Sequence, residues 1–315
     1  MDKKNERFTG IVSECHSCIL NQARSAALFA ELTKKQTNRI LDFAAGELER
    51  AKTTPLLVQH IVRNISDAII KELGESGDFD IYSEVKKRSN ILALSYAEKF
   101  QKKIDRSKSP FEMSLQIAAA GNIIDFGAKS HGSLDLDKEL RILNRIPFAR
   151  YDIDPFKEAL NGASTLLYIC DNCGEIVFDM PFIKELQKRY PDIEITAAFR
   201  DKPIINDAVL RDAEEIGFNK LVRIVSSGSI YPGTILPETT KEFQRLFHSA
   251  DVILSKGQGN FETLLPRADK KLFFLLRIKC EYMAAMSGLE KDNLVLFQGN
   301  RTFKKKWHDT GNISV

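Results

Sequence analysis

The sequence of 315 residues lacks any apolar run of about 18 residues, the length that a membrane-spanning helix needs. Its opening stretch, MDKKNERF, also lacks the apolar segment of a secretory signal. These absences predict a soluble cytoplasmic protein that does not engage a membrane. An excess of one charge sign is missing too, because 46 Lys and Arg face 43 Asp and Glu for a net charge of +3. This balance predicts no nucleic-acid partner.

Cysteine is scarce, with five residues that form two C-x-x-C pairs, Cys15 with Cys18 and Cys170 with Cys173, and leave Cys280 over. An odd number in a chain of this size indicates reduced thiols. About 150 residues separate the pairs, whereas a zinc ribbon uses about 15 to 20, which disfavours a four-cysteine zinc site. Cys15 and Cys18 fall three apart in an expected helix, where packing as small hydrophobic residues is the simpler role.

Nucleotide-binding glycine motifs are absent as well. The segment SKGQGNFET does not have the spacing of a Walker A loop. Gly257 and Gly259 match the first two positions of G-x-G-x-x-G, but Glu262 occupies the third. The sequence therefore disfavours a nucleotide cofactor.

The hydrophobic period changes along the chain. As far as about Arg150 the pattern is helical, with expected helices at Ile11–Leu32, Thr37–Lys52, Pro55–Gly74, Tyr82–Asp105 and from Pro110 toward Gly127. From Ser164 short apolar runs alternate with amphipathic helices, near Glu175–Arg189, Ile205–Ile216, Glu238–Ser249 and Cys280–Met286. The expected strands are Thr165–Ile169, Glu194–Ala198, Val222–Val225, Val252–Leu254, Lys271–Leu275 and Leu294–Phe297.

Strands that alternate with helices predict an α/β class: a Rossmann-like α/β/α domain with a mostly parallel sheet, preceded by an all-helical N-terminal region. We expect the helical region to cover residues 1–150, with a possible division into two subdomains near residue 107. Residues 151–315 then form the α/β/α domain that binds metal and phosphate.

A buried strand in the run LLYICDNCGEIVFD delivers Asp171 and Asn172 to the start of a helix at about Glu175. Open α/β sheets bind ligands at this edge. The side-chain oxygens of Asp171 and Asn172 suit Mg²⁺ or Mn²⁺, and the first turn of the helix favours a phosphate. The alternative is an ordinary Asx turn that caps the helix.

Two later strand ends add further polar residues. The segment RDKPIIND carries Arg200, Lys202, Asn206 and Asp207, and parallel strands end at one edge, so Asp207 can join Asp171 and Asn172 around one metal. Arg200 or Lys202 could bind phosphate oxygens, although a helix with exposed charges would explain this segment equally. After the strand Val252–Leu254, Lys256 supplies a point charge for phosphate.

This set of carboxylates, carboxamide and cations indicates metal-assisted phosphoryl transfer. The nucleophile is either an activated water, which we favour, or Asp171 itself through an aspartyl-phosphate. A Cys173 thiolate is disfavoured, because Asp179 and Met180 stand where a cysteine phosphatase loop carries its arginine.

The separated motifs resemble a family long catalogued as a domain of unknown function and later described as metal-dependent damage-control phosphatases. The resemblance covers nearly the whole chain and depends on five matches in order: Cys15 and Cys18, GNIID at Gly121–Asp125, DNCGE at Asp171–Glu175, Asn206 with Asp207, and KGQGN at Lys256–Asn260. The C-x-x-C is similar to that of the prokaryotic branch.

The resemblance implies a divalent metal (Mn²⁺, Co²⁺, Ni²⁺ or Mg²⁺) held by Asp171, Asn172 and Asp207. It implies hydrolysis of phosphomonoesters of small metabolites, including sugar phosphates and damaged metabolites. Asn122 and Asp125 should then lie over the pocket from the helical side, and Glu175, Lys256 and Asn260 should line it.

Two other functions stay open. One is an adenosylmethionine-dependent carboxyl methyltransferase, an activity described for related eukaryotic members, although this chain has no convincing glycine-rich loop for that cofactor. The other is a non-catalytic metabolite- or metal-binding protein. The sequence does not identify the metabolite, the metal in the cell, the role of Cys15 and Cys18, or the oligomeric state.

Overall fold

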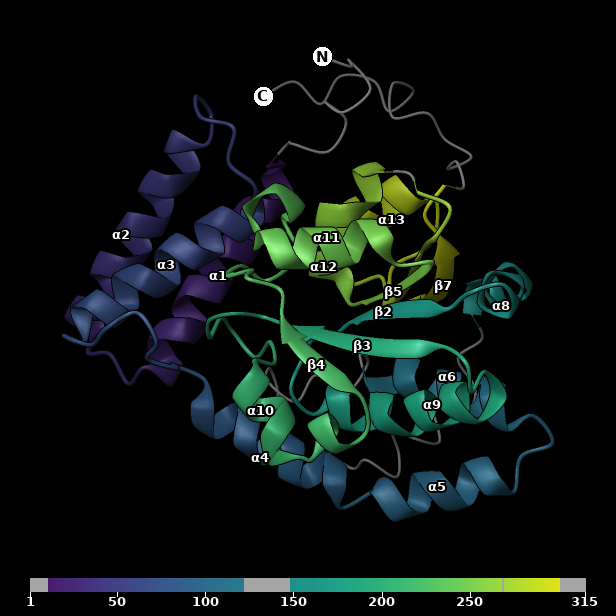
Figure 1. Ribbon diagram of the computed structural model, residues 1–315. Coiled ribbons are helices and arrows are strands. Elements are labelled where there is room, and N and C mark those ends of the chain that lie inside the picture. The colour runs from purple at the N-terminus through teal and green to yellow at the C-terminus, as the bar shows by residue number, and fades with distance from the viewer. Residues whose placement is uncertain (1–10, 122–147, 268, 301–315) are drawn as a thin grey trace.

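The computed structural model describes residues 11–121, 148–267 and 269–300. Its centre is a seven-stranded sheet in the order β1-β7-β6-β5-β2-β3-β4 (Figure 1). Strands β2 to β6 are mutually parallel, whereas β7 pairs antiparallel with β6 and parallel with β1. The strands are β1 (Phe148–Tyr151), β2 (Thr165–Ile169), β3 (Glu194–Phe199), β4 (Arg223–Ser226), β5 (Val252–Lys256), β6 (Leu272–Arg277) and β7 (Leu294–Gln298).

The sheet confirms the predicted fold class, and every strand expected from the sequence is present within a few residues. The strand that the sequence pattern missed is β1. It has four residues, FARY, that alternate between half-buried and exposed, and it lies at the edge of the sheet. A short edge strand carries little of the apolar signal that marks the buried strands.

Helices cover both faces of the sheet and one end of it. They are α1 (Ser13–Phe29), α2 (Lys34–Arg50), α3 (Val58–Glu72), α4 (Ser83–Leu94), α5 (Ala97–Asp105), α6 (Pro110–Gly121), α8 (Ile153–Asn161), α9 (Glu175–Arg189), α10 (Leu210–Glu215), α11 (Lys241–Ser249), α12 (Gln258–Leu264) and α13 (Glu281–Ser287). Among the described residues, no helix is both long and apolar enough to cross a membrane.

Several helix boundaries differ from the expected ones. The single helix expected at Tyr82–Asp105 is two helices, α4 and α5, because the turn between them tightens where the Ser95 hydroxyl donates to the Leu92 carbonyl at 2.6 Å. Pro55 was expected in the first turn of its helix, but α3 begins at Val58, where the Leu57 N–H donates to Nδ1 of His60 at 3.0 Å. Helices α8 and α12 were not expected.

Helix α10 also starts later than expected, at Leu210 instead of Ile205. Ile205 adopts a φ of 39°, a left-handed conformation that a β-branched residue rarely takes and that a helix excludes. The residues between Ile205 and Leu210 therefore form a separate turn at the end of β3.

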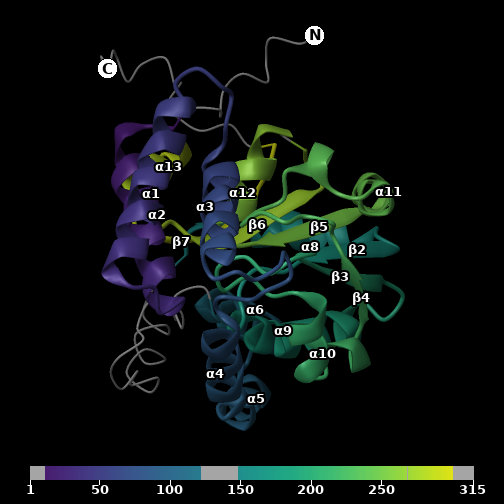
Figure 2. The same ribbon diagram turned by 90° about the vertical axis from the view of Figure 1, so that its left-hand side faces the viewer.

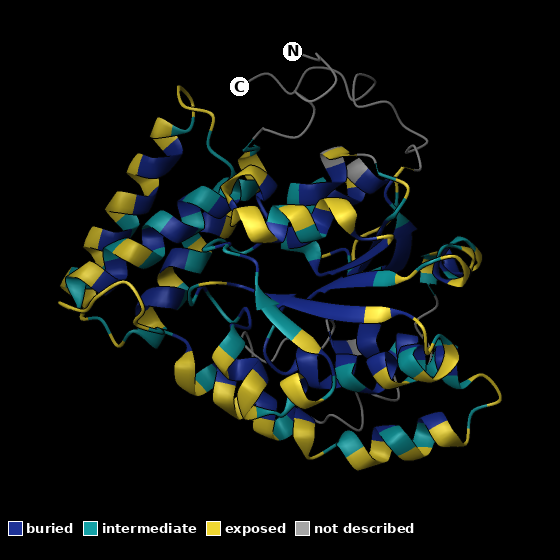
Figure 3. Cartoon of the chain, viewed as in Figure 1, coloured by how far each residue is buried: buried dark blue, intermediate teal, exposed yellow. Residues whose placement is uncertain are grey.

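The apolar residues form three clusters. One lies between the sheet and α4, α5, α6, α8 and α9, and a second lies between the opposite face and α11, α12 and α13. A third cluster joins α1, α2 and α3 to one another (Figure 2). Figure 3 shows the buried strands between their exposed helical covers. The N-terminal helices thus fall into two packing groups, and the predicted division into residues 1–150 and 151–315 stays a prediction.

Candidate active site

Two turns at the carboxyl-terminal edge of the sheet lie side by side and bring the predicted metal ligands together. The N–H of Ala208 donates to the Asp171 carbonyl at 2.8 Å, and the N–H of Cys173 donates to the Asn206 carbonyl at 2.9 Å. Asn172 and Asp207 form an antiparallel bridge between the turns. Residues 171, 172 and 207 therefore share one corner of the molecule although 35 positions separate the last two.

The end of β5 contributes a close backbone approach to the same corner. Gly257 has a φ of +79°, and a Cβ atom there would lie 2.0 Å from Oδ2 of Asp171. A side chain at this position would displace the carboxylate, so the chain passes Asp171 only because residue 257 is glycine. The same conformation turns β5 into α12, which explains why that helix follows the strand so directly.

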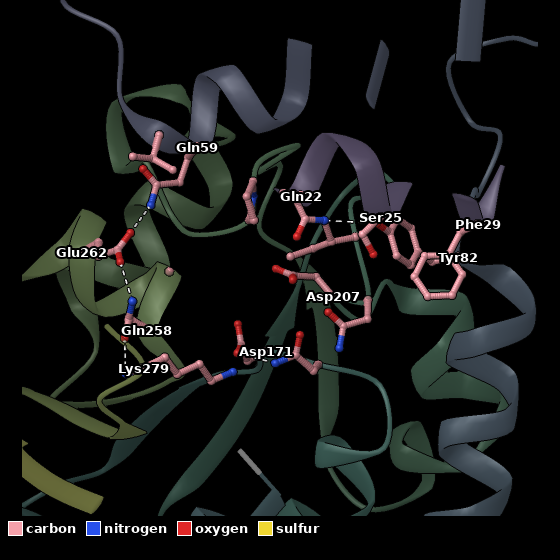
Figure 4. Close-up of a pocket in the computed structure, with 16 residues that line it drawn as sticks. Gln22, Ser25, Phe29, Gln59, Tyr82, Asp171, Asp207, Gln258, Glu262 and Lys279 are labelled. Carbon is pink, nitrogen blue, oxygen red and sulfur yellow. Dashed lines mark hydrogen bonds between the residues drawn. The ribbon is translucent and has the colours of Figure 1, made fainter. Parts of the chain in front are cut away.

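A cavity of about 300 Å³ opens between this corner and the N-terminal helices. Asp171 and Asp207 are directed toward it, as is Lys279, which lies between β6 and α13 (Figure 4). The residues that line the cavity include side chains from α1 (Gln22, Ser25, Phe29), α3 (Gln59), the two turns (Asp171, Asn172, Asn206, Asp207), α12 (Gln258, Glu262) and the loop at Lys279.

The two carboxylates of the cavity are buried and close to one another. Asp171 is 7% exposed and Asp207 is 2% exposed. Burial raises the pKa of both carboxyl groups, and the negative charge of Asp207 raises the pKa of Asp171 further. A positive charge beside the two buried carboxyl groups would stabilise their ionised forms.

Arg200 supplies part of that positive charge from beneath. Its Nε donates to Oδ2 of Asp207 at 2.7 Å, and its Nη2 lies 3.5 Å from Oδ1 of Asp171. The guanidinium opposes the rise in pKa of both groups. The amide of Asn172 donates to Oδ2 of Asp171 at 2.7 Å and to Oε2 of Glu175 at 3.3 Å, which fixes the orientation of its carboxamide.

The donor set fits a hard divalent cation in chemistry and leaves part of the coordination to other ligands. Asp171, Asn172 and Asp207 offer carboxylate and carboxamide oxygens, the ligands that Mg²⁺ and similar ions prefer. In the described parts of the chain, no group of three or more His, Cys, Asp or Glu side chains is arranged to hold a metal. A cation at this corner would therefore take its remaining ligands from water or from a bound phosphate, as Mg²⁺ commonly does.

Lys256, expected at the phosphate, lies beneath the cavity and does not line it. Its ammonium is 2.7 Å from Oε1 of Glu175, donates to Oδ1 of Asp179 at 2.6 Å and donates to the Ala118 carbonyl at 3.0 Å. The hydroxyl of Tyr168 donates to the same Asp179 oxygen at 2.6 Å. The Lys256 side chain is fully buried and its ammonium is taken up by two hydrogen bonds and the ion pair with Glu175, so from this position it does not reach the cavity.

The other residues expected at the phosphate do not line the cavity either. Arg200 and Glu175 are 1% exposed, and the amide of Asn260 donates to the Lys256 carbonyl at 2.8 Å. Lys202 lies 3.5 Å from Asp78 at the surface. Asn122 and Asp125 lie outside the described residues, so their expected place over the pocket stays a prediction.

Lys279 is the residue that the sequence reasoning missed. Among the described side chains that line the cavity, it is the one cation, and its charge opposes the rise in pKa of Asp171 and Asp207. The signal was present in the sequence, because Lys279 follows β6, which runs parallel to β5 and ends at the same edge. The rule that selected Asp171 and Asp207 from their strand ends also selects Lys279.

The cysteines fall into two environments. Cys170 and Cys173 are buried, and burial raises the pKa of both thiols well above the ordinary value, which opposes a thiolate nucleophile. Cys15, Cys18 and Cys280 line a second cavity of about 270 Å³. Gln59, Gln258, Glu262 and Lys279 belong to the walls of both cavities.

A family model described as the damage-control phosphatase ARMT1-like domain matches residues 11–295. The chain belongs to this family. An uncharacterized protein of Methanocaldococcus jannaschii is 31% identical over 307 residues, with 91% of this chain and 95% of that protein covered. A damage-control phosphatase of Pyrococcus horikoshii is 30% identical, with 90% and 96% covered, and one of Archaeoglobus fulgidus is 27% identical, with 89% and 96% covered.

A solved structure gives the same assignment. The crystal structure of a DUF89 family protein from Pyrococcus horikoshii matches with a TM-score of 0.81 and 31% identity, and the match covers 92% of this chain and 99% of that one. The family predicted from the sequence motifs is confirmed. Membership supports phosphatase activity for the chain.

Proposed function

We propose that the protein is a divalent-metal-dependent phosphatase that hydrolyses phosphomonoesters of small metabolites, such as sugar phosphates or related damaged metabolites. The observation that carries the proposal is the meeting of Asp171, Asn172, Asp207 and Lys279 at one cavity wall. Oxygen ligands for a cation and a positive charge for a phosphate are thus within one site.

Asp171, Asn172 and Asp207 would hold the metal. A divalent cation bound there supplies Lewis acidity toward the phosphoryl group and lowers the pKa of water. Arg200 opposes the rise in pKa of the two carboxyl groups and orients them, since it contacts both from the buried side. Glu175 accepts from the Asn172 amide nitrogen, which leaves the carboxamide oxygen as the atom available to a cation.

Lys279 would bind the phosphate of the substrate from the cavity side. Lys256 would act indirectly, because its ammonium holds Glu175 and Asp179 in the layer beneath the ligands. This division of roles replaces the phosphate contact first expected of Lys256.

The remaining walls suit the rest of a small hydroxylated substrate. Gln22, Ser25, Gln59 and Gln258 are neutral hydrogen-bonding side chains, and about 300 Å³ accommodates a sugar-sized molecule. Neutral amides and hydroxyls match the alcohol groups of a sugar and add no second charge site for another phosphate.

An attacking water fits this site better than an aspartyl-phosphate. Oδ2 of Asp171 accepts from the Asn172 amide at 2.7 Å, Oδ1 faces Arg200 at 3.5 Å, and Gly257 passes closely on another side. A carboxylate held on these sides is suited to binding a cation and has little freedom to approach phosphorus in line.

The test is phosphate release from sugar phosphates after EDTA treatment, with and without added Mn²⁺, for the wild type and for Asp171→Asn. We expect activity to need Mn²⁺ in the wild type and to be lost in the variant. Equal activity with EDTA and with Mn²⁺ would contradict the metal role. Mn²⁺-induced thermal stabilisation without hydrolysis would favour a binding protein, and calorimetric binding of adenosylmethionine without metal would favour the methyltransferase.

A further inference from the structure

Helix α4, which belongs to the N-terminal half of the chain, contacts the first of the two turns at the active site. Oδ1 of Asn90 accepts a hydrogen bond from the N–H of Gly174 at 2.6 Å in a buried position. Gly174 is the N-cap residue of α9, has a φ of +81° and has no side chain with which to cap the helix. Asn90 thus satisfies a helix-end N–H group in the turn that carries Asp171 and Asn172.

The same helix holds the second turn through Lys86. This side chain is fully buried, and its ammonium lies 2.8 Å from Oδ2 of Asp80 and 2.5 Å from Oδ2 of Asp212. Oδ2 of Asp212 also accepts the N–H of Val209 at 2.9 Å, two residues beyond Asp207. Lys86 is therefore linked to the turn of Asp207 through one carboxylate.

One face of α4 connects the two turns, because Lys86 and Asn90 both lie on it. Lys86 and Asn90 are four positions apart, which places them one turn from each other on one face of α4. A buried lysine is expensive in desolvation, and a well-packed apolar residue would often give equal or greater stability. The charge is better explained by the geometry that it imposes on its partners.

We propose that Asn90 and Lys86 are positioning residues that fix the separation of the Asp171–Asn172 turn from the Asp207 turn, and so set the affinity of the site for a divalent cation. The inference depends on the metal role proposed for those three residues. Metal sites need their ligands held within a fraction of an ångström, and loss of a group that orients a ligand typically weakens metal binding about 10- to 100-fold.

The direct test is Mn²⁺ binding by isothermal titration calorimetry in the absence of substrate. We expect Asn90→Ala to weaken Mn²⁺ binding at least about 10-fold, because Gly174 N–H loses its acceptor. Asn90→Asp keeps an acceptor at the same position and should restore most of the affinity. Lys86→Met should weaken binding to a similar degree, since Asp212 loses its partner.

Kinetics separate positioning from a general loss of structure. In both weakened variants the Mn²⁺ concentration that gives half-maximal activity should rise in parallel with the dissociation constant. The KM for substrate and the kcat at saturating Mn²⁺ should stay within about twofold of the wild type, since neither residue lines the cavity.

Two control variants distinguish a specific loss of Mn²⁺ affinity from a general loss of stability. Ser89 lies beside Asn90, is 4% exposed and donates its hydroxyl to the Val85 carbonyl of its own helix, so Ser89→Ala perturbs the packing of α4 alone. Thr33→Ala removes the capping box of α2, a helix that contributes no residue to the cavity wall. Both should lower the melting temperature and leave the Mn²⁺ dissociation constant unchanged.

The outcomes are distinct. If Asn90→Ala and Lys86→Met unfold more easily but bind Mn²⁺ as the wild type does, the inference is overturned and the proposed function stands. If Lys86→Met does not fold, the Asn90→Ala and Asn90→Asp pair decides. A wild-type protein that binds no Mn²⁺ overturns both proposals.

Discussion

The Lys256 ammonium donates to Oδ1 of Asp179 at 2.6 Å in an interior where both side chains are fully buried. Removal of one member of such a pair leaves a charge without its partner, which typically costs about 3–5 kcal/mol. We expect Lys256→Met to lower the free energy of unfolding by about this amount in urea titrations.

The same variant tests the role of Lys256 at the site. If Lys256→Met is as stable as the wild type and fails only to bind phosphate, then the direct phosphate contact predicted from the sequence is correct and the structural role is wrong.

Asp179 should give a pH dependence to stability. Burial, more than any other factor, raises its pKa from 3.8 to about 6. A carboxyl group with a raised folded-state pKa stabilises the protein most below its unfolded pKa of about 3.9, and this contribution is lost as the pH rises through about 6. We therefore expect the urea midpoint of the wild type, relative to that of Asp179→Asn, to fall between pH 4 and pH 7. A difference that is constant or rises over this range would contradict the assignment.

Gly257→Ala should disable the site through Asp171. The new Cβ atom would meet Oδ2 of Asp171 at 2.0 Å, so the carboxylate has to move and Mn²⁺ binding should be lost. Gly217→Ala is the matched control, because Gly217 has a φ of +77° and its nearest neighbour would be 3.8 Å away. Both variants carry the same backbone strain, and only the first should lose Mn²⁺ affinity in calorimetry. Equal loss in both would assign the effect to the backbone.

Lys279→Ala should weaken the binding of phosphate. We expect the inhibition constant of inorganic phosphate and the KM for a sugar phosphate to rise about 10- to 100-fold, which corresponds to one charge-assisted contact of about 1.5–3 kcal/mol. Lys202→Ala provides the comparison, because that side chain lies off the cavity beside Asp78. Larger effects at Lys202 than at Lys279 would restore the role that the sequence suggested for Lys202.

The sequence predicted the corner of the sheet better than the orientation of its side chains. Asp171, Asn172 and Asp207 follow strands whose ends must meet in a parallel sheet, so local pattern and topology were sufficient to bring them together. Lys256 follows the same rule but is buried, because Asp179 on α9 and the Ala118 carbonyl on α6 take its ammonium. Those partners are remote in sequence, and no local pattern indicates them.

The contribution of the N-terminal helices was equally hidden. Asn90 and Lys86 read as ordinary polar positions of a helix, and their contacts with Gly174 and Asp212 arise only from the packing of α4 beside α9 and α10. Lys279, by contrast, is predictable from the sequence. The strand before it is recognisable, and the rule that strand ends meet at one edge of the sheet applies to it as well.

The cavity is built by two groups of elements with separate interiors. Helices α1 and α3, whose apolar residues pack within their own cluster, supply Gln22, Ser25 and Gln59, whereas the sheet supplies Asp171 and Asp207. Replacement of Gln22 or Ser25 would change the first wall without removing a side chain from the two apolar clusters that cover the sheet. Changes in α1 could therefore alter which molecule fits the cavity while Asp171 and Asp207 at the sheet edge stay in place.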